Sequence, residues 1–77
     1  MPPITVVYTQ PNCGPCTAVK AKLRKLGVEF EERNVQEGNY ADEVRALGYQ
    51  GTPVVVLPDG TSHHGYRPHE LEYIVEG

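Results

Sequence analysis

The sequence predicts a single α/β domain with the element order strand, helix, strand, helix, strand, strand, helix. Two runs of β-branched and apolar residues, at 4–9 and 54–57, have the composition of buried strands. Between them, apolar residues recur at helical spacing over residues 13–26. Because a strand, a helix and a second strand form a βαβ unit with parallel strands, we expect a mixed four-stranded sheet with three helices packed on it.

The first half of the chain has clear local signals. Residues 4–9 are almost continuously apolar, so we expect this strand in the middle of the sheet with both faces covered. The helix at 13–26 tolerates Pro15, because the N–H groups of a first turn lack intrahelical partners. Its predicted buried stripe consists of Cys16, Val19, Leu23 and Leu26. Gly27 is the expected C′ residue of this helix, and residues 28–35 are predicted to form the second strand.

The second half of the chain predicts shorter elements. Asn39 follows a turn and can cap a helix over residues 40–47, with Asp42 in the capping-box position. The predicted buried stripe of this helix consists of Tyr40, Val44 and Leu47. The remaining elements are a loop at 49–53, a strand at 54–57, a hairpin turn at 58–61, an edge strand at 62–64 and a last helix from Pro68 to about residue 76.

Length and composition argue against several classes of protein. The 77 residues suit one domain, spanning 1–77, and the net charge of −3 argues against nucleic acid as a partner. No apolar run reaches the roughly 18 residues that a membrane-spanning helix needs. The first residues also lack the basic and apolar segments of a secretory signal. Together with a closely spaced cysteine pair, these features favour the reducing environment of the cytoplasm.

Cys13 and Cys16 are the two cysteines of the chain, and they lie where the first strand meets the first helix. A thiolate is the attacking species in disulfide exchange. The N-terminus of a helix favours negative charge, so we expect the pKa of the Cys13 thiol to fall from ~8.5 toward about 7. Cys16 begins the apolar stripe and should be shielded. We therefore predict that Cys13 attacks a target disulfide and that Cys16 resolves the mixed disulfide.

Two other uses of a cysteine pair are weaker alternatives. A disulfide that closes so short a loop stabilises a fold by roughly 2 kcal/mol, so a purely structural bridge would gain more by joining distant segments. A structural zinc site needs four ligands, and the pair supplies only two. The histidines at 63, 64 and 69 could be recruited, but their spacing resembles no zinc finger, and we expect them at the surface. We therefore predict no metal site.

The cysteine motif and three further motifs resemble the NrdH-redoxins, which are glutaredoxin-like proteins of the thioredoxin fold. The resemblance covers nearly the whole chain. It rests on Val7-Tyr8-Thr9-x-Pro11-x-Cys13-x-x-Cys16, Ala46-Leu47-Gly48-Tyr49, Thr52-Pro53-Val54-Val55-Val56 and Gly65-Tyr66-Arg67-Pro68. The last of these is similar to the Ser-Gly-Phe-Arg-Pro signature of that family and is the most specific of the four.

The resemblance implies a small dithiol electron carrier with no bound cofactor and a redox-active Cys13–Cys16 disulfide. Proteins of this family are reduced by thioredoxin reductase with NADPH, and they pass electrons to class Ib ribonucleotide reductase, the enzyme of deoxyribonucleotide synthesis. We therefore expect thioredoxin reductase and ribonucleotide reductase as partners of a monomeric chain.

The same similarity implies a substrate-binding surface. The Thr52–Pro53 bond is expected to be cis, which leaves the Thr52 backbone free to pair with an extended substrate segment. The expected substrate-binding residues are Tyr8, Gly14, Pro15, Thr52, Pro53, Gly65, Tyr66 and Arg67. Packing in the core or at its rim is the alternative for Tyr8 and Tyr66, and solvation is the alternative for Arg67.

Some residues depart from the family pattern. Gly14-Pro15 between the cysteines is typical of thioredoxins, and Gln10 stands where many relatives carry lysine. His63-His64 stand where the family usually has Trp-Ser, and His69 replaces an acidic residue. The glutathione-binding Gly-Gly-x-Asp pattern is missing, because Tyr66 follows Gly65. The alternatives are a glutathione-dependent glutaredoxin, a general thioredoxin-like reductase of protein disulfides, and a metal-binding Cys-x-x-Cys module.

Overall fold

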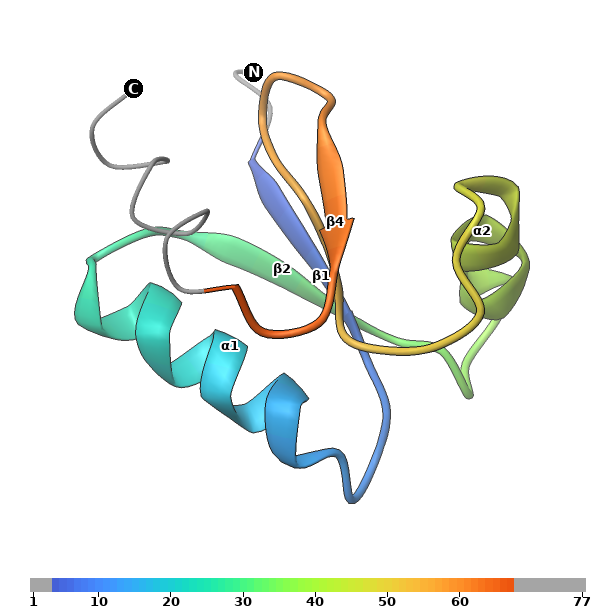
Figure 1. Ribbon diagram of the computed structural model, residues 1–77, viewed down its shortest axis with the longest axis horizontal. Coiled ribbons are helices and arrows are strands. Elements are labelled where there is room, and N and C mark those ends of the chain that lie inside the picture. The colour runs from blue at the N-terminus through green and yellow to red at the C-terminus, as the bar shows by residue number, and fades with distance from the viewer. Residues whose placement is uncertain (1–3, 68–77) are drawn as a thin grey trace.

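The computed structural model describes residues 4–67, whose strands form one four-stranded sheet in the order β2-β1-β3-β4 (Figure 1). The elements are β1 (Thr5–Thr9), α1 (Gly14–Lys25), β2 (Phe30–Asn34), α2 (Tyr40–Ala46), β3 (Val54–Val56) and β4 (Ser62–His64). The described residues thus contain the first two predicted helices. The predicted helix from Pro68 to about residue 76 lies outside them.

The central position of β1 organises the sheet. It pairs in parallel with β2 on one side and antiparallel with β3 on the other, and β3 pairs antiparallel with β4. The parallel pairing of the first two strands and the β3–β4 hairpin confirm the predicted mixed sheet. The hairpin turn is closed by Asp59, whose carboxylate accepts hydrogen bonds from the backbone N–H and the hydroxyl of Thr61 at 2.9 and 2.7 Å.

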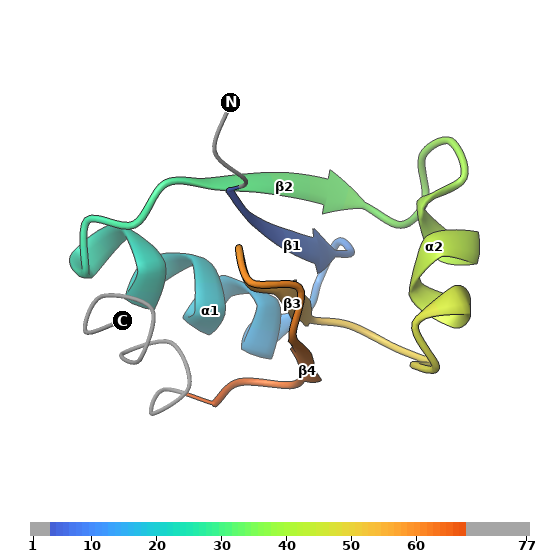
Figure 2. The same ribbon diagram turned by 90° about the horizontal axis from the view of Figure 1, so that it is seen from above.

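The two helices lie on opposite faces of the sheet (Figure 2). On the α1 face, Val7 and Val55 of the sheet pack with Val19 and Leu23 of the helix, all at 0% exposure. On the other face, the core consists of Tyr8, Val44 and Val54. The prediction that the first strand is covered on both faces is therefore confirmed.

Helix α1 follows its predicted pattern. Cys16, Val19 and Leu23 are buried, and Leu26 caps the helix one residue after its end at Lys25. Gly27 has a φ of +73°, the left-handed conformation that glycine adopts at low cost after a helix. The predicted C′ role of this glycine is confirmed.

Helix α2 differs from its prediction. Only Val44 is buried, Leu47 is 43% exposed, and the Asn39 side chain makes no capping hydrogen bond. The prediction of a stripe that includes a buried Leu47 was therefore wrong. Leu47 is the C-cap residue, with a helical backbone and a hydrogen bond from its N–H to the Glu43 carbonyl, so helical spacing alone does not determine which side chains of this short helix are buried.

A polar cluster also joins α2 to the sheet. Arg33 of β2 donates a hydrogen bond from Nη1 to Glu43 Oε1 at 2.9 Å and another to the Tyr8 hydroxyl at 3.1 Å. The Tyr8 hydroxyl donates to the same carboxylate oxygen at 2.7 Å. The guanidinium also lies over the rings of Tyr8 and Tyr40, 5.7 and 5.4 Å from their centroids. Burial and the Glu43 carboxylate raise the pKa of Tyr8, which keeps this hydroxyl a donor.

The histidines of β4 lie on different faces. His63 is only 7% exposed, because its register partner is Val55, whose side chain faces α1. The expectation that His63 lies at the surface was therefore wrong. His64 is exposed as expected, and its ring stacks on Tyr49 with centroids 6.2 Å apart. His69 lies outside the described residues.

Candidate active site

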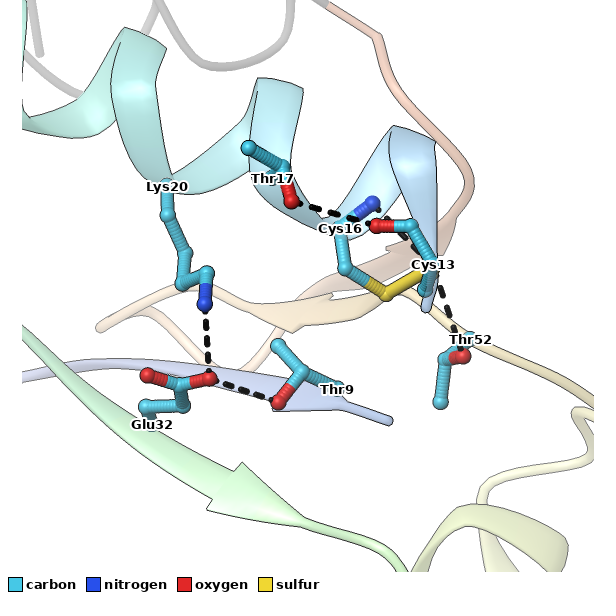
Figure 3. Close-up of a disulfide and its surroundings, with 7 residues drawn as sticks. All are labelled: Thr9, Cys13, Cys16, Thr17, Lys20, Glu32 and Thr52. Atoms are coloured by element: carbon cyan, nitrogen blue, oxygen red, sulfur yellow. Dashed lines mark hydrogen bonds and ion pairs between the residues drawn. A yellow bond between two sulfur atoms is a disulfide. The ribbon is translucent and has the colours of Figure 1, made fainter. Parts of the chain in front are cut away.

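A tight turn after β1 positions the first cysteine. Asn12 adopts a φ of +60°, a left-handed conformation that asparagine tolerates better than most residues. The chain then enters α1 with Cys13 as the N-cap residue. Cys13 and Cys16 form a disulfide across the first turn of the helix (Figure 3).

The two sulfurs have different surroundings. Cys13 is half-buried, and its Sγ accepts a hydrogen bond from the backbone N–H of Cys16 at 3.2 Å. The Thr52 hydroxyl donates to the same Sγ at 3.8 Å. Cys16 is 2% exposed, at the start of the buried stripe of α1. After reduction, the donors at Cys13 and the helix N-terminus would favour a thiolate there, whereas the sulfur of Cys16 would stay shielded.

The Thr52–Pro53 bond is cis, as the resemblance implied. The Pro53 side chain is fully buried, and its carbonyl accepts a hydrogen bond from the Gly65 N–H at 2.8 Å. The Gly65–Pro53 hydrogen bond and the contact between Thr52 and Cys13 bring three predicted site segments together. These segments are the cysteine turn, the Thr52–Pro53 loop and Gly65.

The remaining predicted contact residues are placed differently. Gly14 and Pro15 are exposed in the first turn of α1, next to the disulfide. Tyr66 and Arg67 are exposed in the segment after Gly65. Tyr8 is only 5% exposed and lies in the core on the α2 face, which agrees with the packing alternative.

A polar cleft of about 500 Å³ lies beside the disulfide. Its walls include both cysteines and three residues that form a chain of hydrogen bonds, Thr9, Lys20 and Glu32 (Figure 3). Lys20 Nζ lies 2.9 Å from Glu32 Oε2, and the Thr9 hydroxyl donates to the same oxygen at 2.8 Å. These two bonds lower the pKa of the Glu32 carboxyl, so it is ionised at neutral pH.

Sequence reasoning missed the role of Lys20 and Glu32 in this cleft. Lys20 lies four residues after Cys16, so helical spacing alone places it on the same side of α1. The position of Glu32 depends on the register between β1 and β2. This register pairs Glu32 with Val7 and therefore puts Glu32 on the α1 face of the sheet. That register could not be predicted from the sequence, because apolar and polar residues alternate only weakly along β2.

A second, smaller cleft of about 180 Å³ lies on the other side of Gln10. It separates α2 from the loop that carries Thr52, and its lining includes Val44 and Tyr49. The Tyr49 hydroxyl lies 2.9 Å from the Ser62 hydroxyl, which joins this loop to β4. The first cleft thus includes the disulfide in its wall, and the second is lined by Thr52, whose hydroxyl contacts Cys13 Sγ.

Residues 4–67 contain neither a metal-binding cluster of side chains nor a helix able to span a membrane. No three histidine, cysteine or acidic side chains gather there in a position to hold a metal ion. Neither α1 nor α2 has the length and apolar character to cross a membrane.

Comparisons with known proteins agree with this geometry. The glutaredoxin family model matches residues 5–62. The chain is 34% identical over 76 residues to the Gene 56 protein of Mycobacterium phage L5, covering 96% of this chain and 73% of that protein. It is 40% identical over 58 residues to the NADPH-dependent thioredoxin reductase 3 of Arabidopsis thaliana, covering 68% of this chain but only 11% of that protein.

A solved structure is similar over almost the whole length. It is that of the glutaredoxin-like protein NrdH-redoxin from Escherichia coli, described as having a thioredoxin-like activity profile. The TM-score is 0.82 and the identity 34%, with 91% of this chain and 92% of that chain covered. The chain therefore belongs to the glutaredoxin family and is a thiol–disulfide oxidoreductase of the glutaredoxin type.

Proposed function

We propose that this protein is a dithiol electron donor to ribonucleotide reductase, recycled by an NADPH-dependent thioredoxin reductase. The Cys13 thiolate attacks one sulfur of the target disulfide, and the other target sulfur leaves as a thiolate that takes up a proton. The Cys16 thiolate then attacks Cys13 Sγ and releases the second target thiolate. The target gains two electrons and two protons, and the Cys13–Cys16 dithiol becomes a disulfide.

The observation that carries this proposal is the difference between the two sulfurs. Cys13 has hydrogen-bond donors and an open cleft beside it, whereas Cys16 is 2% exposed directly behind it. A target can therefore reach Cys13, while the covalent bond that forms there is within reach of Cys16. This arrangement suits two-cysteine exchange with a large disulfide partner.

The similarity to known proteins supports thioredoxin reductase as the source of electrons. The NrdH-redoxin of Escherichia coli is a glutaredoxin-like protein with a thioredoxin-like activity profile. A stretch of an Arabidopsis NADPH-dependent thioredoxin reductase is also similar to 68% of this chain. We infer that reducing equivalents come from NADPH through such a reductase, in the cytoplasm, and that the chain acts as a monomer.

We assign substrate contact to the exposed residues around the disulfide. Gly14 and Pro15 border it directly, and the Thr52 backbone beside the buried Pro53 offers a short edge for an extended target segment. The Gly65 N–H donates a hydrogen bond to the Pro53 carbonyl, and this contact supports substrate contact by Gly65 and by the exposed Tyr66 and Arg67 that follow it.

Coupled turnover tests the proposal. Thioredoxin reductase, NADPH, this protein and the oxidised ribonucleotide reductase of one host are mixed, and NADPH oxidation is followed. We expect turnover that depends on this protein and disappears with Cys13→Ser. Brisk turnover with glutathione and glutathione reductase, together with none with thioredoxin reductase, would instead identify a glutathione-dependent glutaredoxin.

A second candidate is a general reductase of protein disulfides. The Gly14-Pro15 pair between the cysteines favours it, since this dipeptide is typical of thioredoxins. Rates measured on ribonucleotide reductase, insulin and a small model disulfide separate the two functions. A dedicated donor should be fastest on ribonucleotide reductase, whereas a general reductase should show similar rates on all three.

A further inference from the structure

The cleft beside the disulfide holds an ion pair that the exchange mechanism does not use. Lys20 comes from α1 and Glu32 from β2, and their charged atoms lie 2.9 Å apart. The Thr9 hydroxyl of β1 donates to the same carboxylate oxygen at 2.8 Å, so three elements meet at this point (Figure 3). The side chains are 22% exposed for Lys20 and 39% exposed for Glu32. Both residues line the cleft together with Cys13 and Cys16.

The two charges of this pair have opposite effects on a nearby thiolate. An ammonium group beside a cysteine stabilises the thiolate, and a carboxylate destabilises it. Glu32 is ionised at neutral pH and forms an ion pair with Lys20. The two opposite charges therefore largely cancel in their effect on the sulfurs. The other cation that acts on Glu32 is Arg24, whose guanidinium lies over the Phe30 ring, 5.7 Å from its centroid.

We propose that Glu32 is a positioning residue for thiol–disulfide exchange. By binding Lys20, it cancels the charge that would otherwise stabilise the Cys13 thiolate, and so it sets how oxidising the Cys13–Cys16 disulfide is. A disulfide becomes a stronger oxidant when its reduced form is stabilised. Glu32 therefore makes the reduced protein a stronger reductant, and this effect does not depend on the target disulfide. This role concerns the exchange chemistry of the family and is independent of the donor assignment above.

A charge cycle tests the proposal. The variants are Glu32→Gln, which keeps the shape, Lys20→Met, which keeps the apolar stem, and the double variant. The matched controls are Glu29→Gln and Lys25→Met, which remove the same charges from exposed positions that do not line the cleft. The first readout is the rate at which iodoacetamide alkylates Cys13 in the reduced protein at pH 6. The second is the ratio of dithiol to disulfide at equilibrium with a glutathione redox buffer.

We expect opposite effects from the two single variants. Glu32→Gln should speed Cys13 alkylation about threefold and shift the equilibrium toward the dithiol by a similar factor, because Lys20 then acts on the thiolate alone. Lys20→Met should change both quantities in the other direction, because the Glu32 carboxylate is then uncompensated. The double variant should return close to the wild-type values, and the two controls should stay within error of them.

Several results would overturn the proposal. The first is that Glu32→Gln and Lys20→Met shift the alkylation rate and the dithiol-to-disulfide ratio in the same direction. The second is that the double variant shows the sum of two changes of the same sign. The third is that neither single variant differs from its control. A merely structural ion pair predicts the first or second result, since either substitution would loosen the same contact. Thermal unfolding identifies a variant that is not folded, and the remaining single variant with its control then decides the question.

Discussion

At the scale of single residues, the site depends on what each sulfur touches. Cys13 Sγ accepts a hydrogen bond from the Cys16 N–H at 3.2 Å and is half-buried, whereas Cys16 is only 2% exposed. A sulfur that remains reachable can form a bond to a partner, and a sulfur that is buried one turn away can only displace that partner. The attacking role of Cys13 and the resolving role of Cys16 therefore follow from their positions at the start of α1, three residues apart.

The first expectation at this scale concerns the resolving cysteine. Cys16→Ser should leave the attack by Cys13 intact and stop the second step, so a covalent complex with the target accumulates. Non-reducing electrophoresis and mass spectrometry would detect this mixed disulfide. The control is Cys13→Ser, which should form no complex. Full dithiol turnover by Cys16→Ser would show that the roles are assigned wrongly.

The second expectation concerns the pH dependence of stability. The Lys20 and Thr9 bonds lower the pKa of Glu32 in the folded chain below its ordinary value of 4.5. A lowered pKa stabilises the fold at pH values above that ordinary value, and this stabilisation disappears as the pH falls through the folded-state pKa. Because Glu32 is 39% exposed, we expect less than about 1 kcal/mol at neutral pH.

Urea denaturation of the wild-type protein and Glu32→Gln across pH checks this expectation. The wild type should be the more stable of the two above about pH 5, and the curves should converge as the pH falls through the lowered pKa of Glu32. A stability difference that persists unchanged into acid would mean that the carboxylate charge contributes nothing, and that the difference comes from packing.

At the scale of elements, α2 is a short helix with few buried contacts. It buries only Val44, which packs with Tyr8 and Val54 of the sheet, and the cluster of Arg33, Glu43, Tyr8 and Tyr40 adds polar contacts. A helix of seven residues has little stability of its own, so these contacts must hold it in place. The loop that carries Thr52 follows α2 directly, and the seating of α2 therefore affects the site.

We expect Arg33→Met to destabilise the fold by about 1–2 kcal/mol, since it removes a half-buried cation that is stacked on two rings and bonded to Glu43. The matched control is Arg45→Met. Arg45 pairs with Asp42 at the surface, where the two side chains are 67% and 69% exposed, and its loss should cost less than about 0.5 kcal/mol. Urea denaturation measures both. Equal losses would contradict the anchoring role of Arg33.

At the scale of the whole molecule, a core of few residues supports the entire sheet. A chain of 77 residues unfolds with a free energy of roughly 4–12 kcal/mol. Leu23 is fully buried in the α1 core, and Leu23→Ala should cost about 3 kcal/mol, a large part of that total. The matched control is Leu47→Ala at a position that is 43% exposed, where we expect less than about 1 kcal/mol. Denaturation curves that shift equally would show that Leu23 is not central to the core.

Much of this architecture could be predicted from the sequence, because the strong signals are local. The continuous apolar run of β1, the helical stripe through Cys16, Val19 and Leu23, and Gly27 after the helix each depend on neighbouring residues. The cysteine motif also located the redox centre, and the resemblance supplied the cis bond before Pro53.

The parts that sequence reasoning missed depend on contacts between distant segments. His63 is buried because β4 pairs with β3 in a register that places it beside Val55. Glu32 reaches the site only because β2 lies parallel to β1 with Val7 as its partner. A strand of three residues or a charged strand carries too little alternation to reveal its register.

The outer strand β2 has a consequence for how copies of this protein meet. One long side of β2 has no neighbouring strand in the described sheet, and its sequence places Glu31, Glu32 and Arg33 in succession. Backbone groups left open at a sheet border invite a second chain to add itself, and charged side chains oppose that docking. The charged residues of β2 therefore oppose the addition of a second chain along this edge of the sheet.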